Sequence, residues 1–92
     1  MTPPIATPIT AQALQQRLQQ VLQPSRLEVI DESAAHAGHA GANGTGFGTH
    51  FRVRIDSPLF TGLSRLGKHR LVYDALRDFL DSGVHALAIE TP

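Results

Sequence analysis

A low-complexity stretch near the middle of the chain limits what the rest of it can fold into. Residues 34–49 consist almost entirely of alanine, glycine, histidine, asparagine and threonine. Such a sequence buries too little apolar surface to offset the entropy lost on ordering, so we expect a mobile loop. Loops longer than about 12 to 15 residues in compact domains are usually functional or disordered. The fold must therefore be built from the segments on either side.

The segment before the loop is predicted to begin with a lead and a helix. Residues 1–9 contain three prolines, which remove hydrogen-bond donors and disfavour helix, so we expect a disordered or extended lead. Thr10 is a good N-cap, and Ile9 and Leu14 have the spacing of a hydrophobic staple. This pattern predicts a helix that starts at Thr10 and is ended by Pro24. Its core-facing stripe is predicted to consist of Leu14, Leu18, Val21 and Leu22.

Two strands are predicted to flank the loop. Leu27–Ser33 has β-branched residues at its centre, and Phe51–Ile55 alternates between apolar and charged side chains. Such alternation is typical of a half-buried strand. We expect the two strands to form an antiparallel pair joined by the loop. The solvent-exposed face of the second strand is predicted to carry His50, Arg52, Arg54 and Asp56.

The second half of the chain is predicted to be mainly helical. Ser57 and Pro58 suit an N-cap and first helical position, which predicts a helical turn through about Phe60. The apolar spacing then predicts a main helix over Ser64–Asp81, and Gly83 is its expected C-terminal stop.

The last element is predicted to be a strand over Val84–Thr91, rich in valine, isoleucine, leucine and alanine. The predicted order is therefore α-β-β-α-α-β, with helices on one face of a three-stranded sheet. This is an α+β two-layer domain. With 92 residues, we expect a single domain over residues 10–92, preceded by the lead.

Composition narrows the function classes. Eight Lys and Arg balance eight Asp and Glu, so the whole molecule has no net field to hold a polyanion. The absence of cysteine excludes a disulfide and makes a reducing cytoplasm the simplest location. The N-terminus lacks the pattern of a secretory signal, and no apolar run approaches the roughly 20 residues of a membrane span. We therefore expect a cytoplasmic protein that does not act at a membrane.

Five histidines are the clearest candidates for chemistry. Neutral imidazole binds zinc, copper, nickel and iron. His36 and His39 stand at i, i+3 in the loop and could bind zinc, but the loop lacks the ligands of a closed site. From the pattern alone, His85 is a half-buried strand residue, His50 is a surface residue and His69 is structural.

No nucleophile with an adjacent base and no phosphate loop is present, so we do not expect an enzyme.

Four segments together resemble the BolA family. They are Leu27-Glu-Val-Ile-Asp-Glu-Ser, Phe51-Arg-Val-Arg-Ile-Asp-Ser-Pro-Leu-Phe-Thr-Gly, Lys68-His-Arg-Leu-Val-Tyr-Asp-Ala-Leu and Val84-His-Ala-Leu-Ala-Ile. The combination of His-Arg-x-Val-Tyr with a later Val-His-Ala-Leu is specific, and the resemblance covers about residues 10–91.

The resemblance implies a class II KH-like fold and a monothiol glutaredoxin as partner. It implies a shared [2Fe-2S] cluster held by the glutaredoxin cysteine, a glutathione thiolate and two ligands from the BolA-like chain. One ligand is then His85, and the other is His36 or His39. Counting from Asp31-Glu-Ser favours His36, whereas counting back from His50 favours His39. We expect the isolated chain to hold no cofactor and to be a monomer or weak dimer.

A DNA-binding regulator is the alternative function. Arg65, Lys68 and Arg70 form a basic patch that could meet phosphates, and some BolA proteins are described as transcription regulators. A KH domain that grips RNA uses a Gly-x-x-Gly loop, and Gly62–Gly67 does not have that spacing. Aromatic residues do not alternate with the basic ones either. We therefore favour a protein interface over DNA for this patch.

Overall fold

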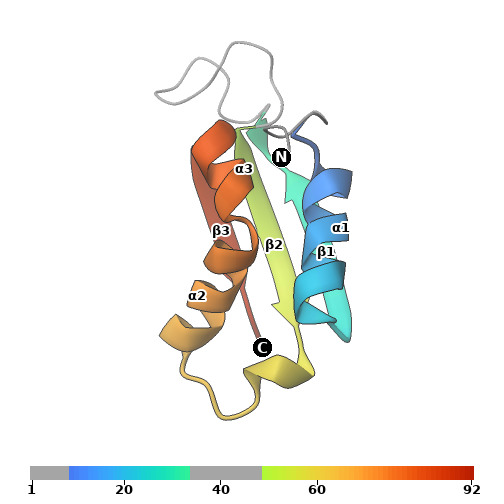
Figure 1. The fold of residues 1–92 in the computed structure, drawn as a ribbon, viewed down its shortest axis with the longest axis vertical. Coiled ribbons are helices and arrows are strands. Elements are labelled where there is room, and N and C mark those ends of the chain that lie inside the picture. Colours follow the sequence, from blue (N-terminus) through green and yellow to red (C-terminus); the bar gives the residue numbers. More distant parts are fainter. Residues whose placement is uncertain (1–8, 34–48) are drawn as a thin grey trace, which may run out of the picture.

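The computed structural model of the chain describes residues 9–33 and 49–92, which form a three-stranded sheet with helices on one face (Figure 1). The lead over residues 1–8 and the loop over residues 34–48, with His36 and His39, lie outside the described residues. The described elements are α1 (Ala11–Leu22), β1 (Arg26–Asp31), β2 (His50–Asp56), the 3-10 turn η2 (Pro58–Phe60), α2 (Arg65–Ala75), α3 (Arg77–Ser82) and β3 (Ala86–Glu90).

The sheet has the order β1-β2-β3, with β2 at its centre. β1 runs antiparallel to β2, with Val29 opposite Val53, which confirms the predicted pair. β3 runs parallel to β2, with Ile89 opposite Val53. A parallel neighbour requires a crossover, and η2, α2 and α3 provide it. The predicted α+β class, the three-stranded sheet and its one-sided layering are confirmed.

The core lies between the sheet and the helices. The alternation of β2 buries Phe51, Val53 and Ile55 on the helix-covered face, as predicted. Burial of a side chain of this size contributes about 1.5–3 kcal/mol of stability. The other buried hydrophobic residues of the core are Leu14, Leu18, Leu22, Phe60, Val72, Ala75, Leu76, Phe79 and Val84.

The first helix begins and ends as predicted but contacts the core through a narrower stripe. The Thr10 hydroxyl caps α1 by accepting a backbone N–H of the first turn at 3.0 Å. α1 buries Leu14, Leu18 and Leu22, which are spaced by four residues. Val21 is 48% exposed, so its predicted place in the core stripe was wrong. The three leucines already fill the contact, and Val21 lies at its margin.

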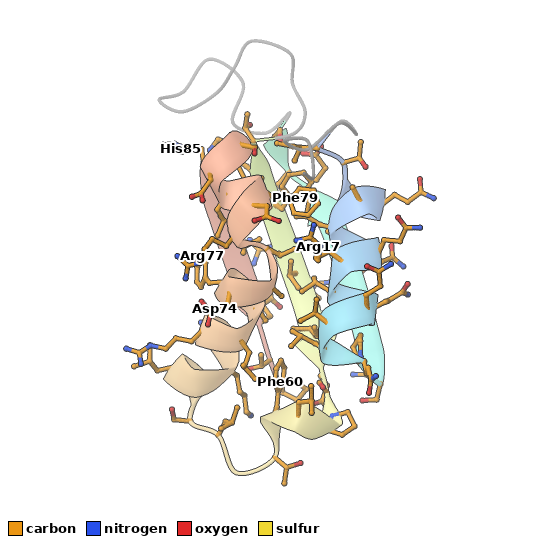
Figure 2. The ribbon with its side chains drawn as sticks, in the orientation of Figure 1. Arg17, Phe60, Asp74, Arg77, Phe79 and His85 are labelled. Carbon is orange, nitrogen blue, oxygen red and sulfur yellow. The ribbon has the colours of Figure 1, made fainter. Side chains whose placement is uncertain are left out.

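The long helix predicted over Ser64–Asp81 is two helices, so that prediction was wrong. α2 ends at Ala75, and Leu76, at φ −105° and ψ 13°, separates it from α3. Arg17 of α1 donates its Nη1 to the Ala75 carbonyl at 3.3 Å and lies over the Phe79 ring, 5.1 Å from its centroid (Figure 2). A side chain that binds a carbonyl of the helix ladder is a known cause of a break. The cause therefore lies on another helix.

The predicted turn and stop around these helices are present. Ser57 accepts the Leu59 N–H at 3.1 Å and begins η2, and Gly83, at φ 141°, ends α3. Within residues 9–33 and 49–92, no helix has the length and apolarity needed to cross a bilayer.

Candidate metal-ligand site

One buried serine ties together the two chain ends that flank residues 34–48. The Ser33 hydroxyl accepts the backbone N–H groups of Thr49 and His50, each at 2.9 Å, and donates to Asp31 Oδ1 at 2.5 Å. Asp31 Oδ1 also accepts the Ser33 N–H at 2.9 Å, as in an Asx turn. Both flanking ends are therefore fixed against the top of β1 and β2 by buried hydrogen bonds.

The same corner fixes the backbone of His85. The Thr49 carbonyl accepts the His85 N–H at 2.7 Å and the Ala86 N–H at 3.2 Å. His85 precedes β3 and lies at the end of the sheet where β2 begins (Figure 2). The residue that closes the 34–48 segment and the candidate ligand His85 are therefore direct neighbours.

Two imidazoles meet at this corner. The ring centroids of His50 and His85 are 5.4 Å apart, with an angle of 51° between the planes. His50 Nδ1 lies 2.8 Å from the Thr49 hydroxyl oxygen, in a hydrogen bond whose direction depends on the tautomer. His50 is only 7% exposed, whereas His85 is exposed.

Both positions differ from the expectations drawn from strand alternation. His50 was expected on the wet face beside Arg52 and Arg54, but it is buried. His85 was expected to be a half-buried strand residue, but β3 begins only at Ala86 and His85 is exposed. Alternation predicts the face on which a side chain lies, but not what covers that face at the end of a strand.

The His85 side chain is available for a ligand in the described part of the chain. It makes no hydrogen bond or ion pair with any described residue, and its ring contact is with His50. No group of three or more His, Asp or Glu residues within residues 9–33 and 49–92 could hold a metal ion. The described part therefore supplies one exposed imidazole with a buried one beside it, and a metal centre here needs donors from elsewhere.

The other predicted site residues lie apart from this corner. His69 is partly buried on α2, and its side chain forms no hydrogen bond with the described residues. Arg65, Lys68 and Arg70 also lie on α2, toward the end of the molecule that carries η2 (Figure 1). The structure does not bring them together with His85.

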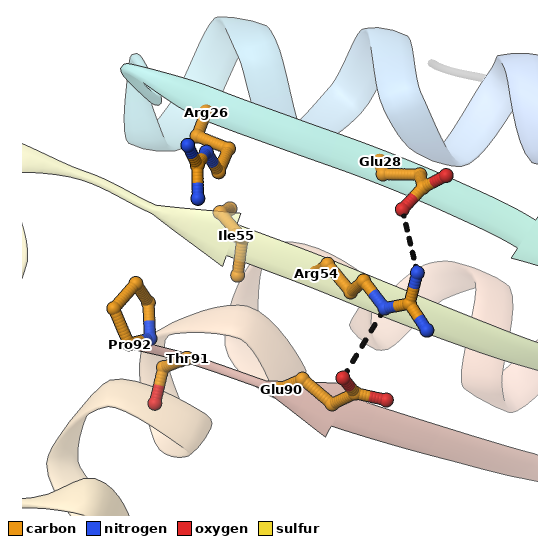
Figure 3. A pocket seen from close by; sticks show the side chains of 7 residues that line it. All are labelled: Arg26, Glu28, Arg54, Ile55, Glu90, Thr91 and Pro92. Atoms are coloured by element: carbon orange, nitrogen blue, oxygen red, sulfur yellow. Dashed lines mark hydrogen bonds and ion pairs between the residues drawn. The ribbon is translucent and has the colours of Figure 1, made fainter.

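The sheet face that the helices leave open carries a chain of ion pairs (Figure 3). Arg54 contacts Glu28 at 3.0 Å and Glu90 at 3.2 Å, and Arg52 contacts Glu32 at 2.9 Å and also contacts Glu90. The hydrogen bond from Arg52, with a further one from Arg54, holds the pKa of Glu90 below its ordinary value. Hydrogen bonds to Glu32 and Glu90 raise the pKa of Arg52. Arg52, Arg54 and the three glutamates of this face are therefore all engaged in ion pairs.

A cavity of about 550 Å³ lies beside these ion pairs (Figure 3). Its lining residues are Arg26, Glu28, Arg54, Ile55, Glu90, Thr91 and Pro92. Arg54 is already paired with both glutamates, which leaves Arg26 as the one charged lining side chain without an ion pair to the described residues, and a single exposed arginine does not define a ligand. We assign it no role.

The residues that hold His85 in place were not predicted from the sequence. Asp31 followed two positions later by Ser33 is a pattern typical of an Asx turn, and this signal was available. Thr49 and His50 gave no such signal, because their contacts depend on the parallel alignment of β3 with β2.

A family profile described as "BolA-like protein" matches residues 18–92. A Sinorhizobium protein, described as an uncharacterized protein in the cobS 5' region, is 48% identical over 80 residues, which cover 86% of this chain and 85% of that protein. Protein BOLA1, chloroplastic, of Arabidopsis thaliana is 48% identical over 80 residues, covering 86% of this chain and 50% of that protein.

The fold agrees with a solved structure from the same group. BolA1 from Arabidopsis thaliana has a TM-score of 0.76 to this chain at 44% sequence identity, covering 95% of this chain and 96% of that one. The chain spans only about half the length of some relatives, 50% of the plant protein and 58% of BolA-like protein 1 from Mus musculus.

Proposed function

The chain belongs to the BolA family, and on that premise we propose that it is an adaptor that binds a monothiol glutaredoxin and co-ligates a bridging [2Fe-2S] cluster. The adaptor would act in iron-sulfur cluster assembly, cluster trafficking or iron regulation. In this proposal His85 is one ligand, and His36 or His39 is the other.

The exposed imidazole of His85 is the observation that carries the proposal. A ligand shared across an interface must be reachable by the partner, and its backbone must be fixed so that the ring has few positions. His85 meets both requirements, because its side chain is exposed and its N–H is bound to the Thr49 carbonyl at 2.7 Å. Thr49 is itself tied to Ser33, which makes the support continuous with the buried sheet.

The donor set of the chain fits half of a cluster site. Clusters of this type are usually held by four thiolates, and in Rieske centres two histidines replace two of them on one iron. This chain has histidines and no cysteine, so it could supply the two imidazoles while the glutaredoxin and glutathione supply the thiolates. When bound, the cluster supplies a one-electron redox centre that protein ligands can tune.

The neighbouring histidine supports the ligand without replacing it. His50 is buried, and the Thr49 hydroxyl holds its Nδ1 at 2.8 Å. Its ring limits the space open to the His85 ring on one side, at a centroid distance of 5.4 Å. We therefore assign His50 a positioning role.

The two loop histidines differ in their distance along the chain from the fixed ends. His36 is three residues from Ser33, whereas His39 is six residues from Ser33 and ten from Thr49. Effective concentration is highest when the length of a tether matches the span that it must cross, and these counts alone do not give that span. Both histidines are therefore kept as candidates for the second ligand.

Reconstitution of the heterocomplex tests the proposal. The full chain is mixed with a monothiol glutaredoxin, glutathione, iron and sulfide, and the visible absorption and circular dichroism spectra of the purified pair are recorded. His85→Ala should remove the features that distinguish the pair from glutaredoxin alone. His36→Ala and His39→Ala are tested separately, and one of them should have the same effect.

His69→Ala is the matched control, because it removes an imidazole from α2, away from the corner that holds His85. The control should reproduce the wild-type spectra. Unchanged spectra for His85→Ala would overturn the ligand assignment. Failure of the wild-type chain to form a cluster-bearing pair would overturn the function itself.

A further inference from the structure

A second exposed surface lies at the end of the molecule opposite His85, where η2 meets the start of α2 (Figures 1 and 2). We call it the leucine-arginine surface, and its residues are Leu59, Leu63, Arg65, Leu66, Lys68 and Arg70. We propose that it docks an acidic, amphipathic segment of a partner protein, separately from the histidine corner.

Three leucines of this surface are open to solvent although the core is close by. Leu59 is 52% exposed, Leu63 is 39% and Leu66 is 61%, whereas Phe60 of η2 is buried. Apolar side chains gathered at one place mark an interaction surface more often than isolated ones do.

The backbone that presents these leucines is held in one shape. Leu63 N–H binds the Phe60 carbonyl at 2.9 Å, and Thr61 N–H binds the Pro58 carbonyl at 3.3 Å. The Ser64 hydroxyl then caps α2 by accepting a backbone N–H at 3.1 Å. A preformed surface loses little conformational entropy on binding, which favours docking.

The charge around the leucines has one sign. Residues 57–71 contain three Lys and Arg and no Asp or Glu. Arg65 and Arg70 form no ion pair with any described residue, and the Lys68 Nζ contacts a backbone carbonyl, that of Pro92, at 3.4 Å. This single sign of charge ends at Asp74, an acidic residue of α2 that pairs with Arg77 at 2.7 Å. A partner with acidic groups beside apolar ones would complement this surface.

The composition of the surface favours a protein over other polyanions. Single-stranded nucleic acid is gripped by exposed aromatic rings on which bases stack, and the only phenylalanine, tyrosine or tryptophan within residues 59–70, Phe60, is buried. Tyr73 of α2 is 40% exposed, but it lies outside the leucine-arginine surface, and its hydroxyl donates to the Leu87 carbonyl at 3.2 Å. Three exposed leucines beside Arg65 and Arg70, which form no ion pair with the described residues, instead match the apolar and acidic faces of an amphipathic helix.

An NMR titration of the full chain tests the inference. The 15N-labelled protein is titrated with a helical peptide of about 16 residues that carries leucines on one face and glutamates on the other. Shift changes are expected in residues 59–70. Binding should weaken at least about tenfold in Leu66→Glu and in the double variant Arg65→Gln with Arg70→Gln.

Two matched variants serve as controls in the same titration. Val21→Glu places the same charge on another exposed apolar side chain, on α1, and Arg26→Gln removes an exposed arginine of β1. Both should bind like wild type, and circular dichroism checks that every variant is folded. A peptide with lysines in place of the glutamates should not bind.

Four results would overturn the inference. They are absence of binding at about 1 mM acidic peptide, shift changes outside the leucine-arginine surface, equal binding of the lysine peptide, or binding of single-stranded DNA or of vesicles rich in phosphatidylserine in place of the acidic peptide.

Discussion

The two ends of this molecule expose side chains in opposite ways. At the histidine corner, formed by Ser33, Thr49, His50 and His85, one exposed imidazole rests on a set of buried hydrogen bonds. At the leucine-arginine surface, three leucines and two arginines are exposed, Lys68 is partly buried, and none of these six residues belongs to the buried core. The comparison shows that the position of one exposed side chain can be fixed by several buried hydrogen bonds, whereas other exposed side chains have few such supports.

This difference has a consequence for mutation. Changes beneath the histidine corner should alter both stability and the position of the ligand, because the same bonds serve both. Changes on the leucine-arginine surface should alter binding and leave the fold intact.

The largest expected effect is on stability from Ser33→Ala. The substitution leaves two buried backbone N–H groups, those of Thr49 and His50, without their acceptor. An unsatisfied buried donor costs about 1–3 kcal/mol, so we expect a loss of roughly 2–4 kcal/mol in the free energy of unfolding. Urea denaturation measures this loss. Ser25→Ala, which removes an exposed hydroxyl, is the control, and a Ser33→Ala loss no greater than that of the control would contradict the account.

A smaller effect is expected from Thr49→Val, which keeps the side-chain shape and removes the hydrogen bond to His50 Nδ1. We expect the free energy of unfolding to fall by about 1 kcal/mol. The imidazole signals of His50 and His85 should shift in NMR spectra. Thr61→Val, at an exposed position without a side-chain hydrogen bond to the described residues, should change neither quantity. Unchanged His85 signals in Thr49→Val would show that the hydrogen bond to His50 does not influence the His85 ring, which would contradict the positioning role of His50.

The open sheet face between the two ends should give the protein a dependence on acid. The folded-state pKa of Glu90 lies below its unfolded value, which is about 4.3. The ionised form of Glu90 therefore stabilises the fold fully at pH values above that unfolded pKa. This contribution is lost as pH falls through the folded-state pKa. Denaturation at a series of pH values should show a shallower decline below about pH 5 in Glu90→Gln than in wild type.

The control for that series is Asp81→Asn, which removes an acid that forms no hydrogen bond or ion pair with the described residues. It should leave the decline unchanged. Equal slopes for wild type and Glu90→Gln would show that the ion pairs of the open face contribute nothing measurable.

The smallest effect on stability is expected from Leu66→Gln. Leu66 is 61% exposed, and leucine and glutamine have similar helix propensities, so the free energy of unfolding should change by less than about 0.5 kcal/mol. Thermal unfolding followed by circular dichroism measures the change. A loss above about 1 kcal/mol would mean that this leucine supports the core and that the contrast between the two ends fails.

Much of the fold could be predicted because the signals were local. The Thr10 cap, the alternation of Phe51, Val53 and Ile55, and the Gly83 stop each depend on neighbouring residues in the sequence. The break between α2 and α3 could not be predicted in this way, because it depends on Arg17, which is distant in sequence. Local patterns predict elements, whereas contacts between elements decide where they are interrupted.

The candidate site was predictable only in part, for the same reason. The motif around His85 identified it as a candidate through its resemblance to the BolA family. The burial of His50 beside it depends on the parallel pairing of β3 with β2, which no local pattern indicates. His36 and His39 lie outside the described residues, so the assignment of one of them as the second ligand stays a prediction.

The central claim is that imidazoles of this chain bind the cluster, and pulsed electron paramagnetic resonance of the reduced heterocomplex tests it most directly. Only the histidines of this chain are labelled with 15N, and the glutaredoxin is unlabelled. Two imidazole ligands should give 15N hyperfine couplings, and the couplings of one of them should disappear in His85→Ala. A reduced cluster signal with no 15N coupling would contradict it.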